Sequence, residues 1–226
     1  MELGSEFNLR LEELEETQHT IYQKLDNYNT CYLDSGRSAI KLLLKELHKG
    51  EVLLPEYICD SVIQAFNKFD IKYYSLLDDL SVDIDDLHSK VNDKTRAVFL
   101  MHYFGALQPA ETLMQIQNMK NKNKFIIIED TTHSIFSKTH TVGDYCVCSL
   151  RKWFAIPDGG VLYSTRSLES LNIESLKRNT RIEKAYGMML KTLYLDGGLE
   201  SNLLYRKIFV ESEKKIDEYK EIARLS

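Results

Sequence analysis

The amino-acid sequence predicts an α/β fold: a large domain with a mainly parallel (mixed) sheet covered by helices on both faces, followed by a helical C-terminal segment. Short apolar runs alternate with helix-like segments between residues 51 and 165, which is the pattern of βαβ units. The runs are continuously apolar, as expected of parallel strands that are buried on both faces. Downstream of residue 166 only helical patterning remains.

Local patterns predict the individual elements in chain order. Residues 7–28 contain leucines among many glutamates and are expected to form a helix, and residues 31–47 a turn and an amphipathic helix. Runs rich in apolar residues, which alternate in the run that ends at Ser149, predict strands at 51–55, 71–76, 95–103, 125–128, 143–149 and 160–164. Helical spacing predicts helices at 60–69, at 83–91 (capped by Asp83) and at 109–121. The expected units are an N-terminal helical segment (1–30), a large domain (31–166) and a helical extension (167–226).

Composition excludes several classes of function. The 226 residues carry a net charge of −5 with mixed signs, so the basic surface of a nucleic-acid-binding protein is not expected. No apolar run reaches the ~18 residues of a membrane span, and the acidic first residues do not resemble a signal peptide. We therefore expect a cytoplasmic protein without membrane contacts. The four cysteines lack zinc-ligand spacing, so free thiols are expected and no metal site.

Two charged residues follow neighbouring strands of the expected sheet. Asp130 ends the run that begins at Phe125, and Lys152 follows the next strand, before the pair Gly159–Gly160. Each residue alone is most simply explained as an ordinary surface or capping residue. Ligands of such sheets bind beyond the carboxyl ends of the strands, so the two side chains are expected to face one site. A lysine that forms a Schiff base and a carboxylate that holds the pyridinium nitrogen are the requirements of pyridoxal 5′-phosphate (PLP) chemistry.

Further residues fit a phosphate group and a cofactor ring. The turn formed by Gly36, Arg37 and Ser38 opens a helix, whose N-terminal N–H groups favour anions. Ser149 lies three residues before Lys152 and offers another hydroxyl for the same phosphate. Ordinary helix capping explains the turn about as well. His133 lies three residues after Asp130, within reach of the phenolic oxygen of the ring or of Asp130 itself.

Six segments, in this order, resemble the DegT/DnrJ/StrS-type sugar aminotransferases, which are PLP enzymes with the aspartate aminotransferase fold. They are SGRSAI (35–40), VLLPEYICDSV (52–62), MHYFG (101–105), IIIEDTTHS (126–134), GDYCVCSLRK (143–152) and DGGVLY (158–163). The resemblance implies that Lys152 forms the Schiff base and moves protons, while Asp130 pairs with the pyridine nitrogen. It places His133 near the phenolic oxygen, where the family usually has Gln. The phosphate ligands it implies are Ser149, Gly36, Arg37 and Ser38.

The same resemblance implies substrates and partners. An amino acid donor, glutamate for example, and a keto-sugar nucleotide would react at sites shared within a homodimer, in polysaccharide or amino-sugar biosynthesis. Two features depart from the family pattern. Cys59 stands where an aromatic residue often stacks on the cofactor, which leaves Tyr57 or His102 as the alternative cover. Family members are also longer, so residues 167–226 would form only the beginning of the small domain.

Other functions remain open from the sequence. A catalytically incompetent or truncated PLP-fold protein, acting as a binding or regulatory partner, is the main alternative. Some related enzymes are sugar dehydratases with histidine in place of the Schiff-base lysine, and Lys152 argues against that reaction. A dinucleotide-binding domain is disfavoured because no G-x-G-x-x-G motif follows the first expected strand.

Overall fold

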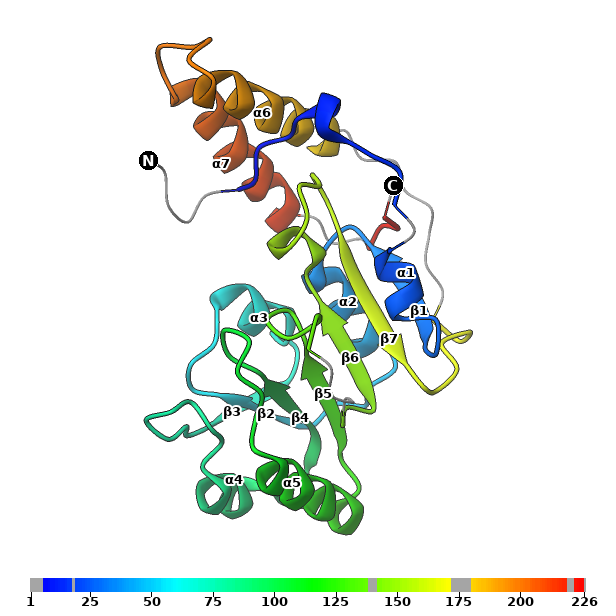
Figure 1. Ribbon diagram of the computed structural model, residues 1–226. Helices are drawn as coiled ribbons and strands as arrows, with labels where there is room; N and C mark the ends of the chain where they lie inside the picture. The colour runs from blue at the N-terminus through cyan, green and yellow to red at the C-terminus, as the bar shows by residue number, and fades with distance from the viewer. Residues whose placement is uncertain (1–5, 18, 138–141, 172–179, 219–221, 226) are drawn as a thin grey trace.

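A seven-stranded sheet forms the centre of the computed structural model, which describes residues 6–17, 19–137, 142–171, 180–218 and 222–225 (Figure 1). The strand order is β1-β7-β6-β5-β4-β2-β3. The strands are β1 (Asn29–Leu33), β2 (Glu51–Pro55), β3 (Asp70–Tyr74), β4 (Thr95–Met101), β5 (Ile126–Asp130), β6 (Tyr145–Cys148) and β7 (Gly160–Ser164). Neighbours from β3 to β6 are parallel, whereas β7 runs antiparallel to both β6 and β1. The predicted α/β class with a mainly parallel, mixed sheet is therefore confirmed.

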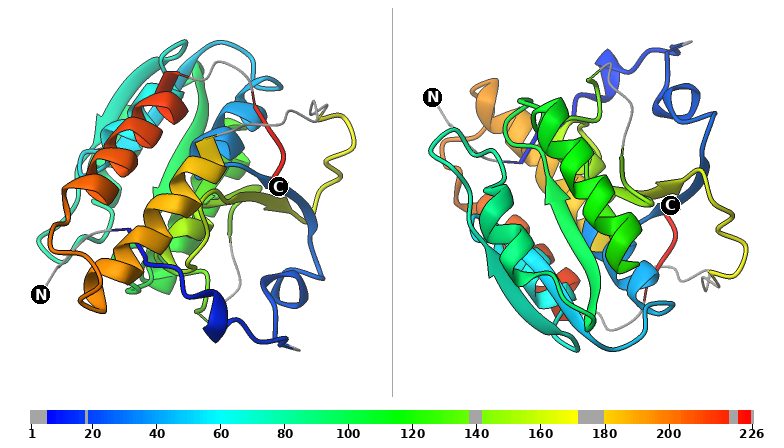
Figure 2. Two further views of the ribbon diagram at one scale, coloured as in Figure 1. Left: turned by 90° about the horizontal axis from the view of Figure 1, so that it is seen from above. Right: turned by 90° about the horizontal axis from the view of Figure 1, so that it is seen from below.

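Helices cover both faces of the sheet because successive strand residues point in opposite directions. On one face, Ala97 and Phe99 of β4 share a core with α2 (Gly36–Leu44) and α3 (Asp60–Ala65). On the other, Val98 and Leu100 share a core with α4 (Ile84–Lys90) and α5 (Ala110–Asn123). Figure 2 shows these layers from above and below. The continuous apolar runs in the sequence are thus strands buried on two sides.

The N-terminal segment differs from its prediction. The expected helix over 7–28 is wrong: the described residues contain only the short helices η1 (Leu11–Glu13) and α1 (Ile21–Lys24). Leu9 packs on the helices downstream of the sheet instead, and α1 forms separately, beginning at the capping box of Thr20 and Gln23 and ending at the buried Leu25. Strand β1 was not predicted, because its sequence NTCYL mixes polar and apolar residues at the edge of the sheet.

Downstream of the sheet, two helices form a hairpin that lies beyond the end of β6 (Figure 1). They are α6 (Thr180–Leu195) and α7 (Leu203–Glu218), and they bury Met188, Tyr205 and Phe209 between them. Residues 6–10 run along this hairpin, with the Leu9 N–H donating to the Met188 carbonyl at 3.2 Å. The predicted helical C-terminal segment is confirmed.

The helical prediction fails at both ends of the extension. Residues 166–171 are not helical, and residues 222–225 run beside β1, where the Asp34 N–H donates to the Ala223 carbonyl at 3.0 Å. The predicted helix over 172–179, 219–221 and 226 lies outside the described residues.

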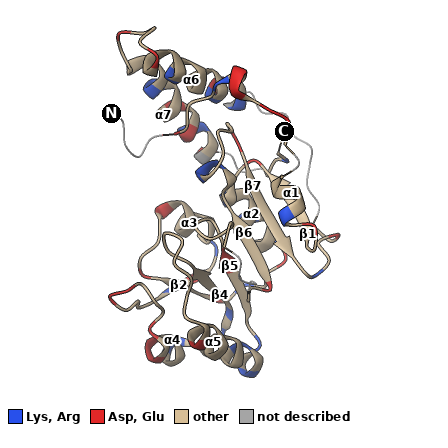
Figure 3. Ribbon diagram, viewed as in Figure 1, with Lys and Arg blue, Asp and Glu red and all other residues tan. Residues whose placement is uncertain are grey.

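Charge is distributed without a dominant sign, since Lys and Arg are interspersed with Asp and Glu over the elements seen in Figure 3. Within the described segments, none of the helices combines the length and the apolar character needed to cross a bilayer.

Candidate active site

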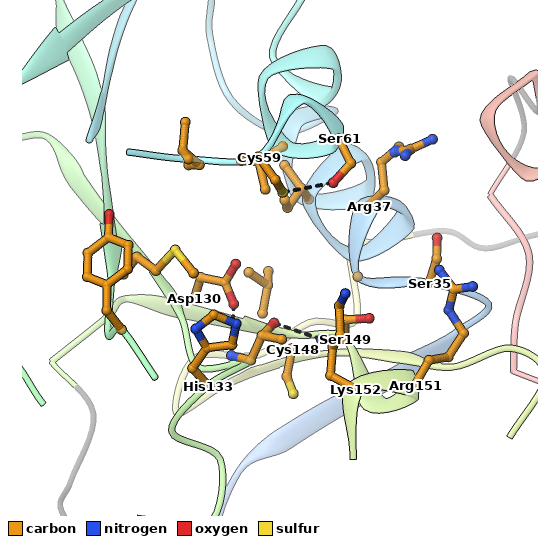
Figure 4. Close-up of a pocket in the computed structure, with 18 of the residues that line it drawn as sticks. Ser35, Arg37, Cys59, Ser61, Asp130, His133, Cys148, Ser149, Arg151 and Lys152 are labelled. Carbon is orange, nitrogen blue, oxygen red and sulfur yellow. Dashed lines mark hydrogen bonds between the residues drawn. The ribbon is translucent and has the colours of Figure 1, made fainter. Parts of the chain in front are cut away.

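A cavity of about 710 Å³ opens at the carboxyl ends of the parallel strands, which is the expected position for a ligand site in such a sheet. Residues that follow β2, β4, β5 and β6 line it, together with the first residues of α2 (Figure 4). The predicted site residues that line the cavity are Gly36, Arg37, Cys59, Asp130, His133, Ser149 and Lys152. Ser38 does not line it, because its side chain is buried and its hydroxyl lies 3.1 Å from the Ser35 hydroxyl.

Asp130 presents a carboxylate to this cavity from the last position of β5. Asp130 is 7% exposed, and one of its carboxylate oxygens accepts a 2.8 Å hydrogen bond from the Thr132 N–H. Burial raises the pKa of Asp130, and the hydrogen bonds from Thr132 and the nearby imidazoles only partly oppose this effect. A cation placed against the carboxylate would offset its desolvation.

Lys152 closes η2 (Leu150–Lys152), a single 3-10 turn directly after β6. The turn is anchored on its large-domain side: Leu150 is buried, and its N–H donates to the Gly159 carbonyl at 3.1 Å. On the other side of the lysine, the Trp153 indole N–H donates to the Thr132 carbonyl. Lys152 itself points into the cavity, beside Ser149 (Figure 4). These contacts with Gly159 and Thr132 therefore hold the backbone of the turn while the lysine side chain stays accessible.

The N-terminus of α2 and Ser149 form one wall. Ser35 caps the helix by accepting from the Ser38 N–H at 3.1 Å, and Gly36 lies so close to Ser149 that a Cβ on the glycine would be 3.1 Å from the serine Cβ. The Ser149 N–H in turn donates to the Thr132 hydroxyl at 3.0 Å. The start of α2, Ser149 and Arg37 thus line one side of the cavity, a combination suited to an anion, although the Arg37 side chain extends away from Ser149 (Figure 4).

His133 and Phe104 form a stacked pair at another wall. Their ring centroids are 5.3 Å apart with planes 21° from parallel, and the Phe104 N–H donates to Nδ1 of His133 at 3.2 Å. A neutral His133 therefore carries its proton on Nε2. Phe104 has a φ of 52°, in the left-handed region. Phe104 was not among the site residues predicted from the sequence. Its position just after the end of β4 is the signal that could have identified it as a cavity residue.

The residues considered as covers for a cofactor ring lie in different surroundings. Cys59 occupies the N-cap position of α3 without a side-chain capping bond, and its Sγ lies 3.0 Å from the Ser61 hydroxyl, on the cavity wall. Tyr57 also lines the cavity and is 56% exposed. His102 does not line it: its imidazole is buried and pairs with Glu129 at 3.0 Å. Cys146 and Cys148 are buried free thiols, and the described residues contain no cluster suited to a metal ion.

The helical hairpin and the N-terminal segment also reach the cavity. Glu6, Phe7, Arg151, Glu213 and Ile216 form this side. Arg151 pairs with Glu213 of α7 at 2.5 Å, and the fully buried Lys184 of α6 pairs with both Glu213 and Glu6. Burial alone would raise the pKa of Glu213, but Arg151 and Lys184 outweigh it and lower that pKa to about 2. No local pattern in the sequence brings these residues together, because they lie up to 210 positions apart in the printed sequence.

Comparison with known proteins gives one matching family. The model of the DegT/DnrJ/EryC1/StrS aminotransferase family matches residues 11–186. No curated protein sequence matches the chain.

Solved structures share the fold at low sequence identity. A putative sugar aminotransferase from Streptococcus pneumoniae, in its PLP form, is 17% identical with a TM-score of 0.55, over 66% of this chain and 44% of that one. A DegT DnrJ EryC1 StrS aminotransferase from Brucella abortus is 16% identical with a TM-score of 0.56, over 65% and 44%. A 3-amino-5-hydroxybenzoic acid synthase is 14% identical with a TM-score of 0.57, over 66% and 41%. The matched region therefore spans less than half the length of these structures.

Proposed function

Because the chain belongs to the DegT/DnrJ/EryC1/StrS aminotransferase family, we propose that its cavity binds PLP and serves an aminotransferase. The observation that carries the proposal is the convergence, in one cavity, of a buried carboxylate, a lysine and a helix N-terminus. The buried Asp130 suits a protonated pyridine nitrogen, which would offset the desolvation that raises its pKa. When bound, PLP supplies an electron sink for charge that develops on the reacting carbon.

Each predicted site residue has a distinct part in this proposal. Lys152 is the point of covalent attachment and, once released, the base that moves the proton from the donor carbon. Asp130 keeps the proton on the ring nitrogen. His133 donates its Nε2 proton to the phenolic oxygen, since Nδ1 already accepts from Phe104. The phosphate is held by Ser149, Arg37 and the N–H groups that open α2. Ser38 supports this wall through Ser35.

The proposed reaction exchanges an amino group for a carbonyl oxygen between two substrates. An amino acid, with glutamate as the expected donor, becomes a 2-oxo acid, and a keto-sugar nucleotide becomes the corresponding amino sugar. The putative sugar aminotransferase from Streptococcus pneumoniae, which shares the fold, supports a sugar as the acceptor. We assign cofactor binding to the large domain, residues 31–166, and the adjoining wall of the cavity to the helical extension, residues 167–226, of which Glu213 and Ile216 line it. The described residues 6–10 of the N-terminal segment (1–30) run along the hairpin.

A homodimer is part of the proposal. Tyr57 and Phe104 line the cavity yet are 56% and 71% exposed, so aromatic surface lies at the site where a second copy would cover it. Large exposed aromatic residues gathered at one place favour an association surface. Sedimentation or light scattering would test this, and a strictly monomeric PLP-bound protein would contradict it.

Covalent trapping tests the cofactor assignment directly. Purified protein is titrated with PLP, the visible absorption is recorded, and borohydride is added before peptide mass spectrometry. We expect a stable adduct on Lys152 that disappears in Lys152→Ala. Lys68→Ala, a change at an exposed lysine outside the cavity, should behave as the wild type. Equal trapping in wild type and Lys152→Ala would overturn the PLP proposal.

A second measurement separates an enzyme from a binding protein. Glutamate added to the PLP-loaded protein should replace the visible band by the spectrum of the amine form of the cofactor and release one equivalent of 2-oxoglutarate. A PLP adduct on Lys152 that glutamate leaves unchanged would instead favour a catalytically incompetent PLP-binding partner.

A further inference from the structure

We propose that Glu213 is a positioning residue for Lys152: it holds Arg151, and through Arg151 it couples the α6–α7 hairpin to the turn that carries the lysine. The inference rests on the proposed function, because it concerns the same site. It adds a link between the helical extension and the proposed cofactor lysine that neither the sequence nor the family match indicates.

The contacts define a short chain of interactions. Glu213 lies on α7 and accepts from Nη1 of Arg151 at 2.5 Å. Arg151 is the middle residue of the three-residue turn that ends at Lys152. Lys184 of α6 donates to the same Glu213 oxygen, and also to Glu6 at 3.0 Å. One carboxylate therefore joins both helices and, through Lys184, the N-terminal segment to the residue before Lys152.

Burial makes this cluster costly to break. The Arg151 side chain is 16% exposed and that of Lys184 is completely buried, while Glu213 is 37% exposed at the cavity wall. Two cations that are largely removed from water require a nearby anion, since an unpaired buried charge is strongly unfavourable. The low pKa of Glu213, about 2, keeps this carboxylate ionised at all working pH values.

The geometry separates this contact from the other anchors of the turn. Leu150 and Trp153 attach it to the large domain, through the carbonyls of Gly159 and Thr132. Of the three residues that anchor the turn, Leu150, Arg151 and Trp153, only Arg151 attaches the turn to the hairpin, through Glu213. Loss of Glu213 should therefore loosen the turn at Lys152 without unfolding the sheet, because the two other anchors remain.

The test compares two glutamates of the hairpin, each of which forms an ion pair with a lysine of the other helix, while only Glu213 also contacts Arg151. Glu213→Gln removes the carboxylate charge with little change of shape. Glu183→Gln is the matched control: Glu183 of α6 pairs with Lys215 of α7 at 2.5 Å, and both side chains are about half exposed, away from the cavity. Two properties are measured in each variant: amide hydrogen exchange of residues 150–153 without PLP, and the circular dichroism of the visible band with PLP.

We expect exchange in the turn to accelerate about tenfold in Glu213→Gln, the effect of losing one charge-assisted hydrogen bond, and the induced dichroism of PLP to weaken. Glu183→Gln should change neither, and Glu213→Asp, which retains the charge, should restore both at least in part. Unchanged exchange and dichroism in Glu213→Gln, or equal changes in Glu183→Gln, would overturn the inference.

If Glu213→Gln fails to fold, Arg151→Gln removes the same contact from the other side and is expected to give the same accelerated exchange; unchanged exchange would overturn the inference. If the wild type does not bind PLP at all, the proposed function fails, whereas the exchange comparison still decides whether Glu213 fixes the turn.

Discussion

Gly160 is the position at which a single methyl group should disturb the candidate site most sharply. It opens β7, and a Cβ built on it would lie 2.1 Å from the carbonyl carbon of Ser35 and 2.4 Å from the Gly36 nitrogen. Ordinary contacts begin at 3.4 Å, so Gly160→Ala requires a displacement of more than 1 Å between two backbones. Backbone cannot rotate away as a side chain can, and overpacking of this kind costs about 3 kcal/mol or more.

A second glycine provides the control. Gly197, in the loop between α6 and α7, has a φ of +80° but nothing within 4 Å of its would-be Cβ. Gly197→Ala therefore carries only the conformational cost of the left-handed region, about 1 kcal/mol. The two variants are expected to differ by about 2 kcal/mol in free energy of unfolding, roughly a 30-fold difference in the folding equilibrium.

Urea denaturation followed by far-ultraviolet circular dichroism measures this difference. The comparison requires that the free energy of unfolding depend on urea concentration with the same slope in both variants. The same displacement moves the start of α2 away from Ser149, so Gly160→Ala should also weaken binding of PLP more than binding of pyridoxal, which lacks the phosphate. Equal free energies of unfolding for Gly160→Ala and Gly197→Ala would refute the close approach of β7 to the α2 N-terminus.

Three further predictions concern single side chains. Ser149→Ala should weaken PLP binding about tenfold, the loss of one hydrogen bond to a charged group, and leave pyridoxal binding unchanged in a fluorescence titration. Asp130→Asn should abolish tight PLP binding. Without cofactor, burial raises the folded-state pKa of Asp130. The free energy of unfolding of the wild type should therefore fall relative to that of Asp130→Asn as the pH rises from acid values through that pKa. If urea denaturation gives the same difference in free energy of unfolding between the two proteins from pH 4 to 8, this expectation is wrong. Glu129→Ala should cost about 3 kcal/mol or more in thermal or urea unfolding, because it leaves His102 and the N–H groups of Val142 and Gly143 without their shared acceptor.

The sequence predicted the parts of the molecule that depend on short-range pattern. Strands β2, β4 and β5 have continuous apolar residues, so their burial could be inferred, and the residues at their carboxyl ends follow from topology. Asp130, His133, Ser149 and Lys152 were found in this way and line one cavity. Their chemical roles stay predictions until cofactor binding is measured.

The missed features depend on contacts between distant segments. Strand β1 has no distinctive pattern and exists because β7 offers it an antiparallel partner. Residues 7–28 have enough leucines to suggest a helix, yet Leu9 packs on the hairpin instead. Glu213 is one of many acidic residues in a charged helix, and only the fold brings it to Arg151. Tertiary contacts of this kind leave no local trace in composition or spacing.

The segment 222–225 has a consequence for how copies of this chain can associate. A strand at the border of a sheet exposes unsatisfied N–H and C=O groups that recruit other chains. Along β1, the backbone of residues 223–225 takes up two of these groups, at Tyr32 and Asp34. At the opposite border, β3 carries the charged residues Asp70 and Lys72, which discourage such pairing. Both borders thus resist the joining of sheets edge to edge, so the proposed homodimer would have to form through another surface, such as the one that exposes Tyr57 and Phe104.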